Sequence, residues 1–295
     1  MSVLVQAHAK LNLHLAVLAR EASGYHSIET VFHRIELADD VVVNVAPPGT
    51  RMVRCSVDVG PMEQNLAYRA AVAFLDATEW DTGFDIQILK RIPAGGGLGG
   101  GSADAAATLR GLNAMCPTLM PQQQLMAIAS GLGADVPFLA SDAVMALAWG
   151  RGERMLSLDP LPLRHVALAI PPFRVATADA YKWLDDSRLA TSVPEVRELR
   201  YWHLANWEEL APHVSNDFES VIANQFAEVQ EIVQALRTSG AVLAGMTGSG
   251  STCFGIYKTP PDQALLERAT QCSVVVTQTS GHHALPTRAA MAALI

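Results

Sequence analysis

The chain has 295 residues, a formal net charge of −8, and 50% hydrophobic residues. This length favours two domains over a single core. The negative charge argues against nucleic acid as a partner, so any phosphate ligand must be held by local features of the fold.

The cysteines and the hydropathy pattern indicate in which cellular compartment the protein is expected. Cys55, Cys116, Cys253 and Cys272 are far apart and form no CxxC pair, which argues against a zinc knuckle or a disulfide framework. There is no signal-like N-terminal pattern and no apolar run long enough to span a bilayer. We therefore expect a cytoplasmic protein that does not associate with membranes.

The N-terminal third reads mainly as strands. Apolar and polar residues alternate over 3–15, which predicts a strand with Lys10, Asn12 and His14 on one face. Considered alone, a lysine at such a position is usually solvated. A turn at Ser23-Gly24 precedes a second alternation. The remaining expected elements of this part are strands at 28–35, 41–45 and 52–57, and a helix that opens at 63–65 and includes Leu75.

A glycine-rich stretch at Pro93–Ser102 is the most informative part of the chain. It lies between an expected strand at 84–92 and an expected helix at 103–115, with Ser102 as the predicted N-cap. Six glycines in ten residues allow close approach of a ligand to the backbone. Because a helix N-terminus offers unpaired N–H groups and partial positive charge, this loop suits a polyphosphate.

Known glycine loops differ in what surrounds them. A dinucleotide-binding fold needs a second strand that ends in an acidic residue, and residues 117–121 provide neither. A Walker A loop ends in Gly-Lys-Ser/Thr, whereas this loop ends in Gly101-Ser102 without the lysine, and the sequence contains no HRD or DFG triplet of a protein kinase. A flexible linker remains the plain alternative.

The region after the loop predicts a helix at 122–130 and a corner at Gly133–Pro137. Pro137 is expected to keep Val136 extended and to hold Asp135 at the corner, where an aspartate is most often a cap or a turn residue. A strand is expected at 143–149. The proline-punctuated stretch at 159–162 predicts a boundary between domains 1–160 and 161–295.

The second half alternates strands and helices, which is typical of a ferredoxin-like α+β domain. A small-residue loop at 247–251 separates two of the strands, and the Ala-rich end at 281–295 is a candidate closing helix. The expected strands are 165–170, 241–245, 252–257 and 273–277, and the expected helices are 178–184, 216–236 and 262–272.

The motifs, read together, resemble those of the 4-diphosphocytidyl-2-C-methyl-D-erythritol kinases, a family of the GHMP kinase superfamily. The resemblance runs in family order from residue 9 to residue 250. It rests on Ala9–Leu13, Gly24–His26, Phe32, Gln64–Leu66, Pro93–Ser102, Gly133–Pro137, Ser215–Asp217 and Thr247–Gly250.

This resemblance implies an α+β fold with two domains, the first like ribosomal protein S5 domain 2 and the second a ferredoxin-like GHMP domain. It implies transfer of the ATP γ-phosphate to the 2-hydroxyl of 4-diphosphocytidyl-2-C-methyl-D-erythritol, in the methylerythritol phosphate route to isoprenoids, with Mg²⁺ as cofactor. The partner is then a small molecule, with no nucleic acid or membrane involved, and the protein is a monomer or a weak homodimer.

The resemblance also implies roles for individual residues. Asp135 is the base and Lys10 its cationic partner, while Ser102 lies near Mg²⁺. Substrate-binding residues are Asn12, Tyr25, His26 and Phe32, with Tyr25 and His26 facing the cytidine ring. ATP-binding residues are Asn65, near adenine, and Pro93, Ala94, Gly95, Gly96, Gly97, Leu98, Gly99, Gly100, Gly101, Ser102 and Ala103.

Some alternatives stay open at this point. Thr247–Gly250 either borders the acceptor pocket or is only a tight turn. Another GHMP kinase, such as a homoserine or mevalonate kinase, would share the loop but lack Gly24–His26. A silent nucleotide-binding module would keep the loop without needing Lys10 and Asp135.

Overall fold

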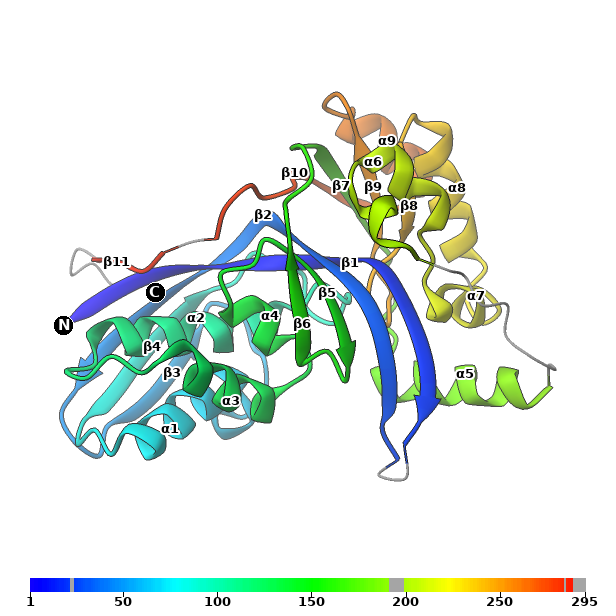
Figure 1. The fold of residues 1–295 in the computed structure, drawn as a ribbon. Helices are drawn as coiled ribbons and strands as arrows, with labels where there is room; N and C mark the ends of the chain where they lie inside the picture. Colours follow the sequence, from blue (N-terminus) through cyan, green and yellow to red (C-terminus); the bar gives the residue numbers. More distant parts are fainter. Residues whose placement is uncertain (22–23, 191–198, 284, 289–295) are drawn as a thin grey trace.

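Two sheets with helices packed against them make up the molecule (Figure 1). We describe it from a computed structural model, which covers residues 1–21, 24–190, 199–283 and 285–288. The first sheet has seven strands in the order β11-β1-β2-β4-β3, with β5 on β2 and β6 on β5. The second has four strands in the order β10-β7-β9-β8. No helix within the described ranges is long and apolar enough to cross a membrane.

The strands of the first sheet are β1 (Ser2–Arg20), β2 (His26–Ala46), β3 (Arg51–Cys55), β4 (Gly83–Leu89), β5 (Met145–Gly150), β6 (Arg154–Leu158) and β11 (Thr287–Arg288). Those of the second are β7 (His165–Ile170), β8 (Leu243–Met246), β9 (Cys253–Tyr257) and β10 (Ser273–Gln278). The helices near the first sheet are α1 (Leu66–Thr78), α2 (Gly100–Met115), α3 (Gln122–Leu132) and α4 (Val136–Ala140). The remaining helices are α5 (Thr177–Ala190), α6 (Trp207–Leu210), α7 (Asp217–Ala223), α8 (Glu228–Thr238) and α9 (Gln263–Thr270). Short 3-10 turns cover Met62–Gln64, Tyr201–Leu204 and Ala211–His213.

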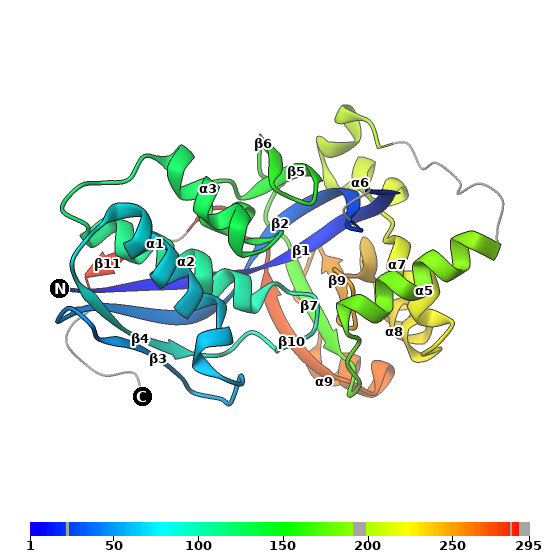
Figure 2. The same cartoon turned by 90° about the horizontal axis from the view of Figure 1, so that it is seen from below.

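The β1–β2 hairpin runs through the whole molecule. Its strands pair antiparallel from the N-terminus, arch across the first sheet, and extend beside α5 and α7 (Figures 1 and 2). Leu15 N–H donates to the carbonyl of Ser215, so the far part of the hairpin is tied to the second half of the chain. Both faces of β1 are therefore buried from Ala7 to Leu15, and the expectation that its polar face is solvated does not hold there.

Helix α2 lies against the hairpin because its buried side is made of small residues. Ala103 and Ala105–Ala107 are at most 2% exposed. A Cβ at Gly111 would lie 2.9 Å from Val43 and 3.3 Å from Val3, so this approach of helix to sheet requires glycine. The contact places the start of α2, and the glycine loop before it, next to β1.

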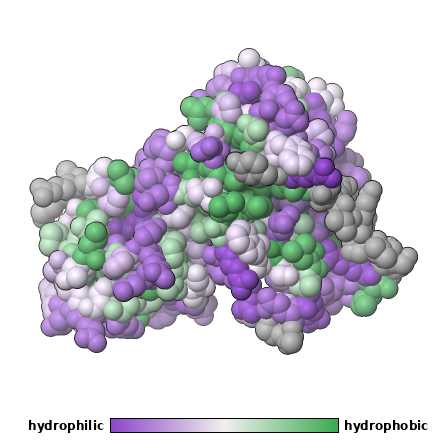
Figure 3. Space-filling model, viewed as in Figure 1, coloured by the Kyte–Doolittle hydropathy of each residue, from purple (hydrophilic) through white to green (hydrophobic). Residues whose placement is uncertain are grey.

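Between the two halves of the chain the surface is hollowed. The notch in the outline of Figure 3 lies between α3 on one side and the hairpin tip with α5 on the other. Most of this face is hydrophilic, and hydrophobic residues gather in its middle. Trp149 of β5 and Leu156 of β6 are exposed. Residues 159–164 connect β6 of the first sheet to β7 of the second. The division into domains 1–160 and 161–295 remains our proposal.

Several predicted elements need correction. The single helix expected at 216–236 is two helices, α7 and α8, and the break lets Phe226 stack on Phe173 at 4.2 Å between ring centroids. Val136 is helical, not extended, because Pro137 falls in the first turn of α4, where its missing N–H costs nothing. Strand β6 was not predicted. The described part of 281–295 contains strand β11 and no helix, and the rest lies outside the described residues.

The start of α2 also differs from the prediction. The helix begins at Gly100 and its N-cap is Gly99, at φ 75°, so Ser102 lies inside the first turn and is not the cap. No side chain caps this end. A left-handed N-cap glycine therefore leaves first-turn N–H groups available to a ligand.

A buried charged cluster anchors the strand that leads into the glycine loop. Lys90, just after β4, is hydrogen-bonded to Asp39 of β2 and, at 2.6 Å, to Oδ2 of Asp104 in α2. Asp39 Oδ1 also accepts the backbone N–H groups of Arg91 and Ile92, at 2.5 and 2.8 Å. Burial, opposed in part by Lys90 and reinforced by Asp39, raises the pKa of Asp104 to about 7. Asp104 therefore holds its proton to a higher pH than an ordinary carboxyl does.

This arrangement predicts how stability changes with pH. Between about pH 4 and 7 the Asp104 carboxyl is ionised in the unfolded chain and protonated in the folded one, so this group lowers the free energy of unfolding as pH rises. Asp104→Asn removes the effect. We expect urea unfolding to show that the free energy of unfolding of the variant, relative to that of wild type, rises by about 1 kcal/mol or more between pH 5 and pH 8. A difference in the free energy of unfolding that does not change with pH would contradict the raised pKa of Asp104.

Candidate active site

Lys10 lies at the centre of the site, buried inside the protein. Its side chain is 3% exposed, and its Nζ lies 2.5 Å from Oδ1 of Asn12 and 3.5 Å from Oδ2 of Asp135. Shifts in register on either side of Lys10, between His8 and Lys10 and between Asn12 and His14, interrupt the regular pairing of β1 with β2. From Lys10 to Asn12 the pairing is regular, so these two side chains share a face and meet, while His14, beyond the second shift, lies near Ser215.

The surroundings of Lys10 weaken its hold on a proton. Burial lowers the pKa of Lys10 below its ordinary value, and the nearby Asp135 carboxylate opposes that change. Phe32 lies beneath the ammonium group, 5.6 Å from Nζ to ring centroid, and is itself fully buried. A buried cation with one carboxylate beside it is a poor contributor to stability and a good device for handling charge that develops in a reaction.

Asp135 precedes α4 and faces the cavity, with 28% of its side chain exposed. The other end of this short helix is held by Arg34, whose guanidinium donates to the carbonyls of Phe138, Leu139, Ser141 and Ala143 at 2.7–3.1 Å. Arg34 thereby satisfies carbonyls that have no partner within the helix. The carboxylate of Asp135 is thus presented by a rigid support.

The glycine loop packs against the small-residue loop of the second sheet. Gly96 accepts a hydrogen bond from Thr252 N–H, and Lys10 N–H donates to Leu98 O at 3.1 Å. A Cβ on Gly97, which has φ 77°, would lie 2.2 Å from the carbonyl oxygen of Thr247. The side-chain hydroxyl of Thr247 accepts a hydrogen bond from the backbone N–H of Asn12 at 2.9 Å. Thr247–Gly250 is therefore a contact between the halves of the chain as well as a tight turn.

A cavity of about 260 Å³ opens where these parts meet. Its lining includes Lys10, Asn12, Asp135, three glycines of the loop (Gly95, Gly97 and Gly99) and Gly248–Gly250. A larger cavity of about 1420 Å³ adjoins it toward the hairpin tip. The two share Ala134, Arg151, Thr177 and Tyr181, so one elongated ligand can reach both.

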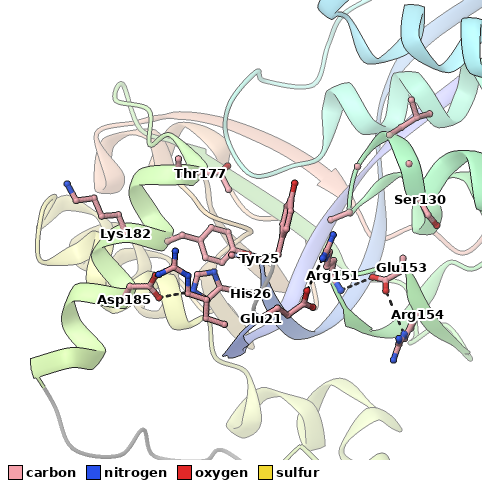
Figure 4. Close-up of a pocket in the computed structure, with 18 of the residues that line it drawn as sticks. Glu21, Tyr25, His26, Ser130, Arg151, Glu153, Arg154, Thr177, Lys182 and Asp185 are labelled. Carbon is pink, nitrogen blue, oxygen red and sulfur yellow. Dashed lines mark hydrogen bonds and ion pairs between the residues drawn. The ribbon is translucent and has the colours of Figure 1, made fainter.

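The hairpin tip forms the far end of the larger cavity (Figure 4). Tyr25 is 60% exposed, and the guanidinium carbon of Arg151 lies 4.0 Å from its ring centroid. Arg151 is also paired with Glu21 at 2.8 Å. His26 stacks on Tyr181, with 4.8 Å between centroids and 22° between planes, and its Nε2 lies 2.7 Å from Oδ1 of Asp185. An aromatic surface with polar edges at this position suits a planar heterocycle.

The other predicted residues occupy distinct places. Asn65 is the N-cap of α1, where its side chain accepts Ala67 N–H at 2.8 Å, and its amide lies 3.5 Å from Cys55 Sγ. Ser102 and Ala103 lie in the first turns of α2, next to the loop. Phe32 does not line either cavity and stacks on Phe138 at 4.9 Å. Phe32 therefore contacts Lys10, and Lys10 in turn lines the smaller cavity.

Three cavity residues escaped the sequence reasoning, namely Arg151, Tyr181 and Asp185. The expected helix at 178–184 contained Tyr181, but helical spacing does not tell which residue meets a hairpin more than 150 positions earlier. Arg151 follows a glycine in what read as an ordinary turn. No local sequence pattern distinguishes these residues, because each lines the cavity through its position relative to segments far away in the chain.

Family models match both halves of the chain. Residues 65–145 match the GHMP kinases N terminal domain, and residues 193–274 match the GHMP kinases C terminal domain. The first match spans α1 through the start of β5 and includes the glycine loop and Asp135.

Curated relatives agree over most of the chain. A 4-diphosphocytidyl-2-C-methyl-D-erythritol kinase of Citrifermentans bemidjiense is 39% identical over 255 residues, which are 85% of this chain and 88% of the relative. A protein of the same name from Pelotomaculum thermopropionicum is 37% identical over 286 residues, 95% of this chain and 98% of the relative.

Solved structures agree in fold. A crystal structure of 4-(cytidine 5'-diphospho)-2C-methyl-D-erythritol kinase has a TM-score of 0.78 and 34% identity, and the match covers 94% of this chain and 99% of that one. Homoserine kinase from Cytophaga hutchinsonii, at 16% identity, shares the fold, with a TM-score of 0.69 and coverage of 97% and 96%.

These matches confirm the expected α+β fold with GHMP N-terminal and C-terminal parts. They also confirm the expectation of an enzyme that acts on a small molecule. The chain is an ATP-dependent kinase and belongs to the 4-diphosphocytidyl-2-C-methyl-D-erythritol kinase family of the GHMP kinases.

Proposed function

We propose that this chain transfers the γ-phosphoryl group of ATP to the 2-hydroxyl of 4-diphosphocytidyl-2-C-methyl-D-erythritol, giving the 2-phosphate on the methylerythritol phosphate route to isoprenoids. The observation that carries the proposal is the position of Lys10 and Asp135, 3.5 Å apart, between the glycine loop and the cavity that leads to the hairpin tip. The donor would lie on one side of this pair and the acceptor on the other.

In this reaction the acceptor oxygen forms a bond to the γ-phosphorus as the bond to the ADP oxygen breaks, and Asp135 takes the hydroxyl proton. Lys10 stabilises the charge on the forming alkoxide and the transferring phosphoryl group. Phosphoryl transfer depends mainly on positioning and on charge stabilisation, and a preorganised buried cation serves both. Burial lowers the pKa of Lys10, and negative charge that approaches Nζ acts in the opposite direction and strengthens its hold on the proton.

The glycine loop and the uncapped start of α2 supply the cradle for the phosphates, from Pro93 to Ala103. Asn65, at the start of α1, is assigned to the adenine end. Mg²⁺ would arrive with the nucleotide, and Ser102 would supply one hydroxyl ligand. That donor set fits Mg²⁺ bound chiefly by phosphates and water, because within the described residues there is no cluster of three carboxylate, histidine or cysteine side chains able to hold a metal.

The hairpin tip would receive the cytidine, with Tyr25 against the base and His26 at its edge. Asn12 would hold the acceptor near Lys10, and Phe32 would support Lys10 from below. The elongated pair of cavities suits an acceptor whose reacting alcohol and base are separated by a diphosphate. The acceptors homoserine and mevalonate carry no nucleobase that could occupy the hairpin tip.

The identity of the phosphoryl acceptor distinguishes the proposed activity from that of a homoserine or mevalonate kinase. We expect purified protein with ATP and Mg²⁺ to release ADP with 4-diphosphocytidyl-2-C-methyl-D-erythritol, and at a far lower kcat/KM with 2-C-methyl-D-erythritol, homoserine or mevalonate. Coupled measurement of ADP would show it. ADP release with homoserine or mevalonate alone would assign the chain a different substrate, and no release with any alcohol would favour a silent nucleotide-binding module.

Replacing the proposed base tests the chemistry. Asp135→Asn should lower kcat by about 10²- to 10⁴-fold and leave ATP affinity nearly unchanged, because the carboxylate acts on the acceptor proton. Asp142→Asn, an aspartate beyond the other end of α4 that is 71% exposed, is the matched control and should turn over normally. Normal turnover of Asp135→Asn would leave Asp135 with a purely structural role.

The phosphate cradle is tested at Gly97. Gly97→Ala adds a Cβ that meets the Thr247 carbonyl at 2.2 Å, so the loop must move, and we expect ATP to bind at least about 10-fold more weakly by calorimetry. Gly49→Ala is the control, because Gly49 has a similar φ of 86° but open space around it. That variant carries the backbone strain without the collision and should bind ATP normally. Equal ATP affinity in Gly97→Ala and wild type would remove this loop as the phosphate site.

A further inference from the structure

An aspartate outside the predicted site holds the histidine at the hairpin tip. Oδ1 of Asp185, in α5, lies 2.7 Å from Nε2 of His26, at the start of β2. The His26 side chain is 7% exposed and that of Asp185 is 31% exposed. In Figure 4 the dashed line joins the two side chains within the wall of the larger cavity. The pair links the hairpin tip to α5.

The environment defines the direction of this hydrogen bond. Oδ2 of Asp185 lies 3.7 Å from a guanidinium nitrogen of Arg20, so each carboxylate oxygen faces one partner. A carboxylate oxygen accepts hydrogen bonds, so the tautomer that satisfies this 2.7 Å contact is the one that carries a proton on Nε2 of His26. The ring cannot readily turn away, because Tyr181 stacks on it at 4.8 Å.

The second ring nitrogen is then an acceptor. In a neutral imidazole with the proton on Nε2, Nδ1 carries a lone pair. Across the described part of the chain, Nδ1 of His26 makes no hydrogen bond. A neighbouring carboxylate that sets the tautomer of a histidine in this way determines what the free nitrogen can recognise.

We propose that Asp185 is a specificity-determining residue, which fixes the His26 tautomer so that Nδ1 accepts a hydrogen bond from the 4-amino group of cytosine. Uracil carries an acceptor oxygen at the same position, and two facing acceptors would repel. Asp185 does not touch the substrate in this arrangement and acts through His26. The inference rests on the proposed function, since it requires a pyrimidine nucleotide at the hairpin tip.

A purely structural role for Asp185 makes a different prediction. If the pair only tethers the hairpin to α5, its loss would affect all acceptors alike. Asp185→Asn keeps the shape but replaces the carboxylate by an amide that can donate to Nε2, which allows the proton to move to Nδ1. The ratio of activities on two bases is the quantity that separates these roles.

The experiment compares kcat/KM on the cytidylated acceptor and on its uridylated analogue for wild type, Asp185→Asn and Asp179→Asn. Asp179 is the matched control because it lies in the same helix, is exposed, carries the same charge and lines neither cavity. We expect wild type to prefer the cytidylated acceptor by at least about 100-fold, Asp179→Asn to keep that preference, and Asp185→Asn to narrow it by about 10-fold or more. ATP KM should not change.

The outcomes separate the two proposals. Failure of wild type to phosphorylate the cytidylated acceptor would overturn the proposed function. Phosphorylation of both acceptors alike by wild type, or a preference in Asp185→Asn within threefold of wild type, would overturn the inference alone. A measurement on wild type guards against a variant that does not fold: ¹⁵N spectra of the histidine rings should show His26 protonated at Nε2 and bare at Nδ1. Protonation at Nδ1 would also overturn the inference.

Discussion

The site depends on the burial of one ammonium group. Lys10 lies where both halves of the chain cover β1, and Asp135, Asn12 and Phe32 are its immediate surroundings. Burying a charge costs several kcal/mol unless it is paired, so this arrangement is weak as a source of stability. It is strong as a means of meeting negative charge, because a cation held in a low-dielectric site requires no rearrangement when a phosphoryl group arrives. Arg34 contributes by holding α4, and hence Asp135, in place.

The β1–β2 hairpin connects this centre to substrate recognition. One continuous pair of strands carries Lys10 in its middle and His26 near its tip, so the reacting end and the base-binding end of the proposed site lie on a common rigid element. Lys10 and Asn12 share one face of β1 in a regularly paired stretch that register shifts bound on both sides. Helix α5 then closes the far end through Tyr181 and Asp185. The separation between the two ends is therefore a property of the hairpin, which suits discrimination by acceptor length.

The glycine loop, which is the proposed phosphate cradle, also joins the two sheets. Gly96 and Gly97 approach Thr252 and the carbonyl of Thr247 so closely that a side chain would collide, and the strand that leads into the loop is held by Lys90 and Asp39. Nucleotide binding at the proposed cradle would thus be coupled, through the same backbone, to the contact between the halves of the chain. The raised pKa of Asp104 is a consequence of placing two carboxylates beside one buried lysine.

The sequence by itself determined the features that depend on neighbours along the chain: the glycine loop between β4 and α2, the approximate start of α1, and most strands of both sheets. Motif order was enough to indicate the family and to nominate Lys10 and Asp135. Only the tertiary structure decided that Lys10 is buried, that Val136 begins a helix, that 216–236 is two helices, and that Tyr181 and Asp185 meet His26. The physical reason is that turns, caps and periodicity are set within a few residues, whereas burial and side-chain pairing across a cavity depend on register and packing between segments more than 100 residues apart.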